Sequence, residues 1–148
     1  MKKKKRFVFL SKKFYESYPL SKYPEIEQKE NRPYIQVCVE IDGVQYAISL
    51  RSDVHHPHVF WTDKANACGV DFSKAVVIKK DDYIDSVKEP HLRQNEFDAL
   101  RGKDYKIKTK MAKYIADYKK AKKDLSKPIN QTLVKYSTLQ YFEKEIGL

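Results

Sequence analysis

The first half of the chain alternates apolar and polar residues, which is the pattern of half-buried β-strands. The two clearest runs are residues 33–41 (PYIQVCVEI) and 44–50 (VQYAISL). Between them, Asp42-Gly43 is a pair that readily adopts the left-handed backbone of a two-residue turn. The two runs are therefore expected to form an antiparallel β-hairpin.

Other parts of this half carry weaker signals. Short apolar runs predict further strands at 6–10 and 74–78, and residues 51–73, rich in His, Pro, Asp and Gly, predict a long loop. Residues 11–32 mix Lys, Tyr, Pro and Glu. Because two of the prolines there exclude a long helix, we expect a surface loop with one helical turn.

From about residue 91 the apolar residues take helical spacing. One stripe, with members three or four residues apart, consists of Ile107, Met111, Ile115 and Tyr118. Pro128 is expected to end this helical region, and a second helix is expected over about 130–146, with Gly147 at its end. The chain is thus expected to be α+β, a single domain over residues 1–148 in which two or three helices pack against a compact, strongly curved antiparallel sheet.

The chain is strongly basic. It carries 30 Lys and Arg against 20 Asp and Glu, a net charge of +10, and residues 91–148 hold 14 of the basic and 7 of the acidic residues. Many lysines fall in the expected helices, among them Lys119, Lys120, Lys122 and Lys123. Such a surface concentrates phosphate-bearing ligands, so nucleic acid is favoured as a partner over an acidic protein or a membrane surface. The alternative without a partner is a lysine-rich helix face that only makes the protein soluble.

Lysines and tyrosines also interleave near the N-terminus, at Lys12, Lys13, Tyr15, Tyr18 and Tyr23. An aromatic ring can stack on any unpaired base and a lysine can contact the adjoining phosphate, so this segment is a candidate RNA contact. Packing of two of these tyrosines on the core explains the same pattern equally well.

Cysteine usage and the N-terminus bear on the compartment. Cys38 and Cys68 alone cannot build a disulfide framework or a zinc ribbon. The four-residue apolar run after Arg6 is too short for a targeting signal, and no stretch is apolar and long enough to cross a membrane. We therefore expect a cytoplasmic protein.

Candidate chemistry follows directly after the second strand of the hairpin. Three of the four histidines lie there, behind a cation and a hydroxyl, in the order Arg51, Ser52, His55, His56 and His58. Imidazole exchanges protons near neutrality because its pKa is about 6.5. Cleaving RNA without a metal needs a group that takes the 2′-proton, a cation that holds the phosphate charge and a group that assists the departing oxygen.

These requirements can be met by the residues present. His55 would exchange protons, Arg51 or Arg32 would grip the non-bridging oxygens, and Ser52 would hydrogen-bond the scissile group. A metal site built from the three histidines and Asp53 is the weaker hypothesis, since the spacing is not that of a helical zinc motif and a proline interrupts it. Ser52 also lacks the Gly-x-Ser-x-Gly elbow of a hydrolase, and solvent-facing histidines without a chemical role remain an alternative.

Three stretches also resemble a known family. They are RPYI running into VEIDG (32–35 and 39–43), YAISLRS (46–52) and GVDFSKAVVI (69–78). The sequence resembles the toxin component of type III toxin–antitoxin systems, the ToxN/AbiQ-type endoribonucleases, and especially the CptN and TenpN branch. The likeness covers most of residues 6–80 and is looser in the helical remainder.

The resemblance implies a strongly curved SH3-like barrel like that of the Kid/MazF ribonucleases. It implies cleavage of A-rich RNA by 2′-hydroxyl attack, without metal or cofactor, leaving a 2′,3′-cyclic phosphate, and a role in abortive infection as a phage defence. It also implies a partner, a pseudoknotted repeat RNA that the toxin cuts from its precursor and that inhibits the toxin in a closed protein–RNA assembly.

By position, the family's serine after the hairpin corresponds to Ser52, and its cation at the start of the preceding strand corresponds to Arg32. Better-known members have Thr before that serine, where this chain has Arg51, and a lysine soon after it, where this chain has residues 53–56 (DVHH). The proton-transfer group is therefore expected to be His55, with His56 or His58 behind it.

The basic helices fit an inhibitor made of folded RNA, which needs a phosphate-contacting surface wider than a catalytic pocket. The four lysines at 119, 120, 122 and 123 are expected to supply it. The competing hypothesis is a non-catalytic RNA-binding protein, in which the histidines contact phosphates and the tyrosines stack on bases.

Overall fold

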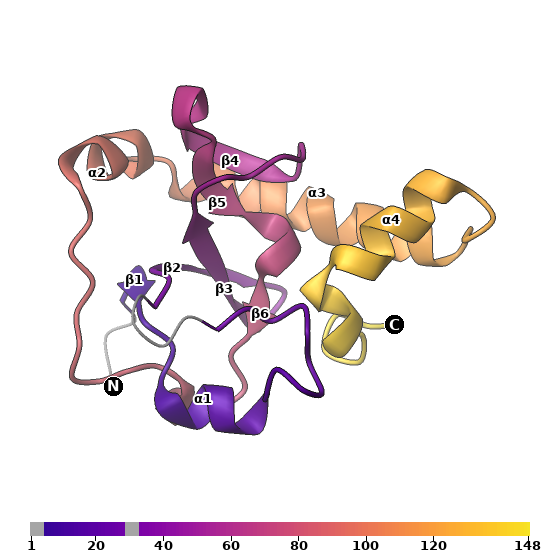
Figure 1. Ribbon diagram of the computed structural model, residues 1–148, viewed down its shortest axis with the longest axis horizontal. Helices are drawn as coiled ribbons and strands as arrows, with labels where there is room; N and C mark the ends of the chain where they lie inside the picture. The colour runs from indigo at the N-terminus through magenta and orange to yellow at the C-terminus, as the bar shows by residue number, and fades with distance from the viewer. Residues whose placement is uncertain (1–4, 29–32) are drawn as a thin grey trace.

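The computed structural model describes residues 5–28 and 33–148 and is α+β, as the sequence predicts (Figure 1). Its strands are β1 (Phe7–Val8), β2 (Gln36–Ile41), β3 (Val44–Arg51), β4 (Val59–Asp63), β5 (Cys68–Asp71) and β6 (Val76–Val77). Its α-helices are α1 (Lys12–Ser17), α2 (Gln94–Leu100), α3 (Asp104–Lys122) and α4 (Pro128–Tyr136). Four 3-10 turns complete the described part, namely η1 (Lys64–Asn66), η2 (Phe72–Lys74), η3 (Asp81–Tyr83) and η4 (Thr138–Tyr141).

The sheet is antiparallel and is organised around β3. The strand order is β1-β2-β3-β5-β4, and β6 also pairs with β3. One edge of β3 pairs with β2 along its length, while the other edge is divided between β6, at Tyr46 and Ala47, and β5, at Leu50 and Arg51. Within the described residues no pairing joins β1 to β4, so the sheet is open.

The predicted hairpin is confirmed. β2 and β3 pair in continuous register from Gln36 opposite Ser49 to Ile41 opposite Val44. The turn residues Asp42 and Gly43 both have positive φ angles, 52° and 78°, which is the backbone that a two-residue turn matching the strand twist requires.

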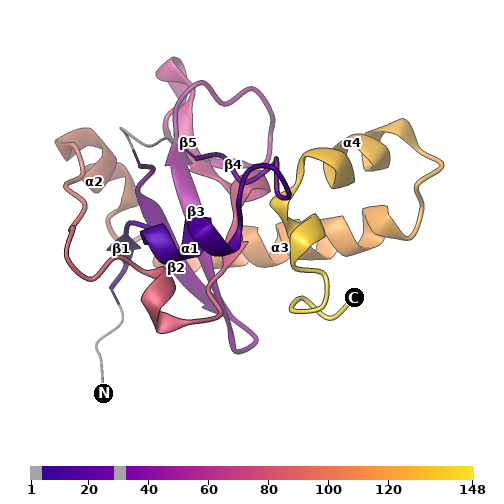
Figure 2. The same cartoon turned by 60° about the horizontal axis from the view of Figure 1, so that its bottom comes forward.

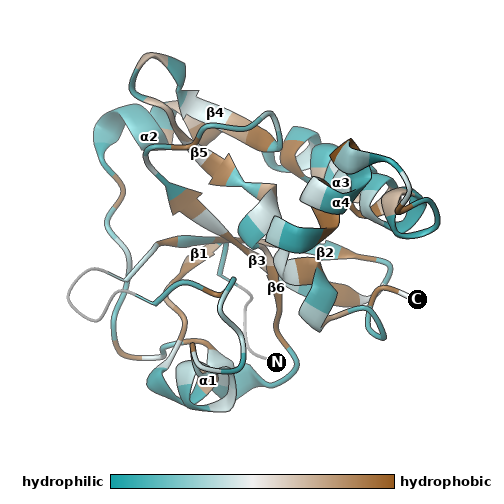
Figure 3. Cartoon of the chain, turned by 45° about the vertical axis from the view of Figure 1, so that its right-hand side comes forward, coloured by the Kyte–Doolittle hydropathy of each residue, from teal (hydrophilic) through white to brown (hydrophobic). Residues whose placement is uncertain are grey.

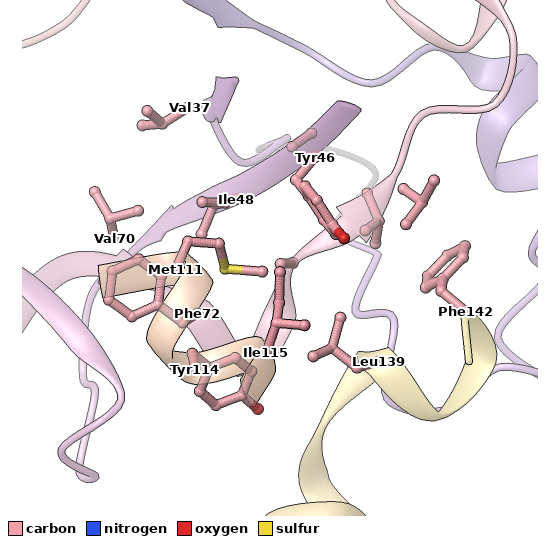
Figure 4. Packing of buried hydrophobic residues seen from close by; sticks show 14 of the residues in the cluster. Val37, Tyr46, Ile48, Val70, Phe72, Met111, Tyr114, Ile115, Leu139 and Phe142 are labelled. Atoms are coloured by element: carbon pink, nitrogen blue, oxygen red, sulfur yellow. The ribbon is translucent and has the colours of Figure 1, made fainter. Parts of the chain in front are cut away.

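The predicted stripe on the long helix is also confirmed. Ile107, Met111, Ile115 and Tyr118 are all buried, and Tyr114 joins them on the same face of α3. Figure 4 shows side chains of α3 directed toward Ile48, Val70 and Phe72 of the sheet region. In Figure 3 the strands carry much of the hydrophobic colour, and α2 is mostly hydrophilic.

Three features differ from the sequence prediction. The expected loop over 51–73 contains β4 and β5, which pair with each other and, through β5, with β3. Pro128 begins α4 and does not end the preceding helical region, because the proline ring fixes φ near its helical value and the first helical residue needs no N–H donor. The second helix also ends early, at Tyr136, and the chain continues as η4.

Helices α3 and α4 lie side by side and extend from the sheet toward one end of the molecule (Figures 1 and 2). The α1 segment lies on another side, where Phe14 is fully buried. None of the described helices has both the length and the apolar character needed to cross a membrane.

Candidate active site at the end of strand β3

The site is built at the end of β3, beside the antiparallel strand β5. Arg51 is the last residue of β3 and pairs with Gly69, two residues before Asp71 at the end of β5. The Arg51 Nη1 donates to Asp71 Oδ2 at 3.1 Å. The Asp71 side chain is only 1% exposed, so the guanidinium is held against a carboxylate that solvent hardly reaches.

His56 contacts the same carboxylate. Its Nε2 lies 3.0 Å from Asp71 Oδ1, an oxygen that also accepts a 2.6 Å hydrogen bond from the Ser73 hydroxyl. Its Nδ1 lies 3.0 Å from the backbone nitrogen of His58. Because a backbone N–H can only donate, Nδ1 is the acceptor and the neutral ring carries its proton on Nε2. Both ring nitrogens of His56 are thus engaged inside the protein.

The electrostatics of the buried pair follow from these contacts. Burial raises the pKa of Asp71, but the hydrogen bonds from His56 and Ser73 and the charge of Arg51 outweigh it, so the pKa lies below its ordinary value. Burial lowers the pKa of Arg51, and the carboxylates of Glu27 and Asp71 more than offset this, so the pKa is raised. Both groups are therefore charged at neutral pH.

The C-terminal part of the chain fixes the turn that follows β5. Thr138, fully buried in η4, donates its hydroxyl to the backbone carbonyl of Ser73 at 3.1 Å and also contacts the carbonyl of Ala75. The turn η2 is thereby held between the sheet and the C-terminal helices. Asp71 and Ser73, which flank its start, have a fixed position relative to β3.

A short acidic segment meets the cations of this site from the other side. Glu27 Oε2 accepts from Arg51 Nη2 at 2.5 Å and from the Tyr34 hydroxyl at 3.2 Å. The Arg51 guanidinium also lies over the Tyr34 ring, 5.3 Å from its centroid. Two residues earlier, Glu25 Oε1 lies 3.0 Å from the Nζ of Lys74.

Ser52 and His55 lie on the exposed loop that leaves β3. Both are exposed, and among the described residues the Ser52 hydroxyl has no hydrogen-bond partner. Asp53 adopts a left-handed backbone, with φ of 58°, and its carboxylate lies 2.5 Å from His55 Nε2. The contact engages Nε2, and the His55 side chain is 74% exposed, so a ligand can reach the ring.

His58 lies closer to the core. Its ring centroid is 5.6 Å from that of His56 and 5.3 Å from that of Tyr114 on α3. Burial and the neighbouring His56 lower the pKa of His58, so its imidazole is neutral at pH 7.

The predicted catalytic residues therefore separate into two groups. Arg51, His56 and His58 gather around Asp71 and Tyr114, whereas Ser52 and His55 lie on the adjoining exposed loop. Arg32 lies outside the described residues. Across residues 5–28 and 33–148, no three His, Cys, Asp or Glu side chains are grouped so that they could hold a metal ion.

The predicted RNA contacts near the N-terminus are only partly on the surface. Lys12 is exposed, and Lys13 is exposed but lies 2.7 Å from Asp82. Tyr15 packs partly buried against the core, where burial and the charge of Tyr34 raise its pKa to about 12. Tyr18 is buried and its ring contacts Phe14, so core packing explains the tyrosine pattern better than base stacking.

The four C-terminal lysines are more accessible. Lys120, Lys122 and Lys123 are exposed at the end of α3, and Lys119 is half-buried. Lys122 lies 3.2 Å from Glu143. The cluster thus presents several ammonium groups at the end of α3 that is remote from its contact with β2.

Sequence reasoning missed Asp71, Ser73, Glu27 and Lys74. The available signal was an aspartate inside the apolar run Cys68–Asp71, because a carboxylate in a buried strand needs a cationic or hydrogen-bonding partner. Glu27 gave no signal, since its partners are distant in sequence.

A pocket of about 790 Å³ lies elsewhere in the described residues, and Val8, Val39, Tyr46 and Tyr105 are among the residues that line it. None of the predicted catalytic residues lines this pocket. We place the candidate site at the end of β3 because buried and titratable groups converge there, which is the usual feature of a functional site. Comparisons with protein-family models, curated proteins and solved structures gave no significant match.

Proposed function

We propose that the chain is a metal-independent endoribonuclease toxin of a type III toxin–antitoxin system. It cleaves A-rich RNA by attack of the 2′-hydroxyl on the adjoining phosphate and leaves a 2′,3′-cyclic phosphate. The observation that carries the proposal is the convergence of Arg51 and His56 on the buried Asp71, beside His58, with His55 and Ser52 on the adjoining exposed loop. A fixed cation and proton-exchanging groups are what metal-free cleavage requires.

The contacts indicate a separate role in cleavage for each residue. Arg51, fixed by Asp71, neutralises the charge on the phosphate, and Ser52 hydrogen-bonds the scissile group. His55 exchanges protons, because its ring is 74% exposed and Asp53 orients it through Nε2. His56 acts by positioning Asp71 and the loop, since both its nitrogens are occupied, and the neutral His58 is a second candidate base.

The proposal extends to the fold relationship and to the partner. We propose that the open antiparallel sheet is a variant of the strongly curved SH3-like barrel of the Kid/MazF ribonucleases. The partner is a pseudoknotted repeat RNA, which the toxin processes and which inhibits it in the cytoplasm. The net charge of +10 supports a polyanionic partner.

The test is to incubate the purified protein with A-rich RNA in excess chelator and to identify the 3′ ends of the products. We expect cleavage with cyclic phosphate ends. Ser52→Ala and His55→Ala should abolish cutting and leave RNA binding within a few-fold. The matched controls Ser86→Ala and His91→Ala, both at exposed positions, should retain cutting.

A non-catalytic RNA-binding protein is the second candidate, and the engagement of both His56 nitrogens within the fold is the observation that favours it. On that hypothesis the protein binds RNA and does not cut it. Cutting that survives both Ser52→Ala and His55→Ala, or that depends on a metal, would contradict the proposed mechanism.

A further inference from the structure

The segment Glu25-Ile26-Glu27 lies across the cations at the end of the sheet. Ile26, only 4% exposed, belongs to the hydrophobic core and anchors the segment. The two glutamates on either side of it reach different cations, Glu25 the ammonium of Lys74 and Glu27 the guanidinium of Arg51. One buried residue thus holds two carboxylates in place over two positive charges.

The two cations belong to one small site. Arg51 and Lys74 line the same pocket, together with Glu27 and Tyr34, and about 10 Å³ of it remains open. The side chains of Arg51 and Lys74 are 17% and 14% exposed, and the carboxylates that cover them are 42% and 24% exposed. The acidic partners therefore form the outer layer, which an incoming ligand meets first.

The donors of Arg51 are only partly used. Nη1 is held by Asp71 and Nη2 by Glu27, whereas Nε is buried and has no hydrogen-bond partner among the described residues. A phosphate can accept from Nε and Nη2 together, as two parallel hydrogen bonds along one edge of the guanidinium. Because Asp71 grips the opposite side, Arg51 keeps its position when Glu27 leaves.

We propose that Arg51 and Lys74 form a phosphate-binding site for the RNA backbone, and that Glu27 and Glu25 occupy it in the protein without RNA. The identity of the ligand rests on the proposed function. RNA binding then requires displacement of the two carboxylates. The apparent affinity is reduced by the fraction of molecules in which they cover the cations.

The test compares two double variants that raise the net charge equally. Glu25→Gln/Glu27→Gln removes the covering charges and keeps the side-chain size, and Glu89→Gln/Asp98→Asn removes two exposed charges elsewhere. The probe is a labelled 2′-O-methyl oligoadenylate of about 12 nucleotides, which binds like single-stranded RNA but lacks the attacking hydroxyl. Fluorescence anisotropy at constant salt gives the affinity.

We expect Glu25→Gln/Glu27→Gln to bind the probe about fivefold or more tightly than the matched control, and Glu27→Gln alone to give part of this gain. Adding Lys74→Gln to the double variant should remove most of the gain. Thermal unfolding verifies that each variant is folded. If the double variant does not fold, the affinity comparison is made with the single variants Glu25→Gln and Glu27→Gln. Equal affinity in the double variant and its control would overturn the proposal.

The same experiment separates this proposal from the proposed function. A wild-type protein that leaves A-rich RNA uncut, while the Glu25→Gln/Glu27→Gln gain is present, refutes the nuclease and supports the phosphate site. Cleavage by wild type without any gain refutes the phosphate site alone.

Discussion

Asp71 links Arg51 and His56 in the candidate site, since its buried carboxylate contacts both side chains. A carboxylate this deeply buried is tolerated because it is paired and hydrogen-bonded. Removing either the charge or a partner therefore affects stability as well as chemistry.

We predict that Asp71→Asn lowers the free energy of unfolding at pH 7 by about 3–5 kcal/mol, because Arg51 loses its buried partner. The folded-state pKa of Asp71 lies below its unfolded value of 3.8, so its contribution is fully present above pH 3.8 and is lost as pH falls through the folded pKa. The difference between wild type and Asp71→Asn should thus narrow only below pH 3.8. Urea unfolding at several pH values measures it.

The control for this experiment is Asp53→Asn, because Asp53 is 87% exposed and should change stability little. A difference between wild type and Asp71→Asn that stays constant down to the lowest pH would contradict the assigned ionisation.

His55 and His56 are neighbours in sequence with opposite environments, and their alanine variants should differ accordingly. His56→Ala should lower the free energy of unfolding by about 1–3 kcal/mol, because it leaves Asp71 and the His58 backbone N–H short of a partner. His55→Ala should leave stability nearly unchanged, since its ring is 74% exposed. Denaturant unfolding of both variants measures the two changes in the free energy of unfolding. Equal losses would show that His56 does not stabilise the fold more than the exposed His55 does.

At the scale of elements, the local sequence pattern was sufficient to predict strands and helices whose contacts are between residues close in sequence. The alternation on both sides of Asp42-Gly43 predicted β2 and β3, and helical spacing predicted the buried face of α3. The strands β4 and β5 were missed because each is short and polar residues surround both, so only their pairing with each other and with β3 identifies them as strands. The histidine cluster is contiguous in sequence and was predicted from local pattern, whereas Asp71 was missed because its partners lie 20 and 15 positions earlier in the chain.

The pairing of β4 with β5 requires glycine at position 69, because a side chain there would collide with β4. A Cβ there would lie 2.5 Å from the Phe60 carbonyl oxygen and 2.7 Å from a Val59 methyl carbon. Gly69→Ala should therefore displace β5, cost about 1–3 kcal/mol and reduce RNA cleavage by moving Asp71.

The comparison is Gly102→Ala, where the cost is limited to backbone strain at a φ of +70° and no atom lies within 4 Å of the added carbon. Thermal unfolding and the cleavage assay, run on both variants, measure the difference. Cleavage by Gly69→Ala at the Gly102→Ala level would contradict a link between β5 and the site.

At the scale of the whole molecule, positive charge at the end of α3 extends well beyond the candidate site. Replacing Lys119, Lys120, Lys122 and Lys123 together with Gln should weaken binding of folded antitoxin RNA more than it slows cleavage of unstructured RNA. The charge-matched control replaces Lys64, Lys80, Lys88 and Lys103, all exposed elsewhere. Titrations with both RNAs test this; equal losses of the two activities would argue against a separate surface.

The bond from Thr138 to the turn after β5 has a consequence for the order in which the protein matures on the ribosome. Synthesis delivers Arg51, His56 and Asp71 first, but the hydroxyl that fixes η2 belongs to Thr138, which lies 67 positions after Asp71. The candidate site is therefore completed only after the chain has been synthesised as far as Thr138. A nascent chain that stalls before this point has the histidines and the arginine but lacks the support that aligns them.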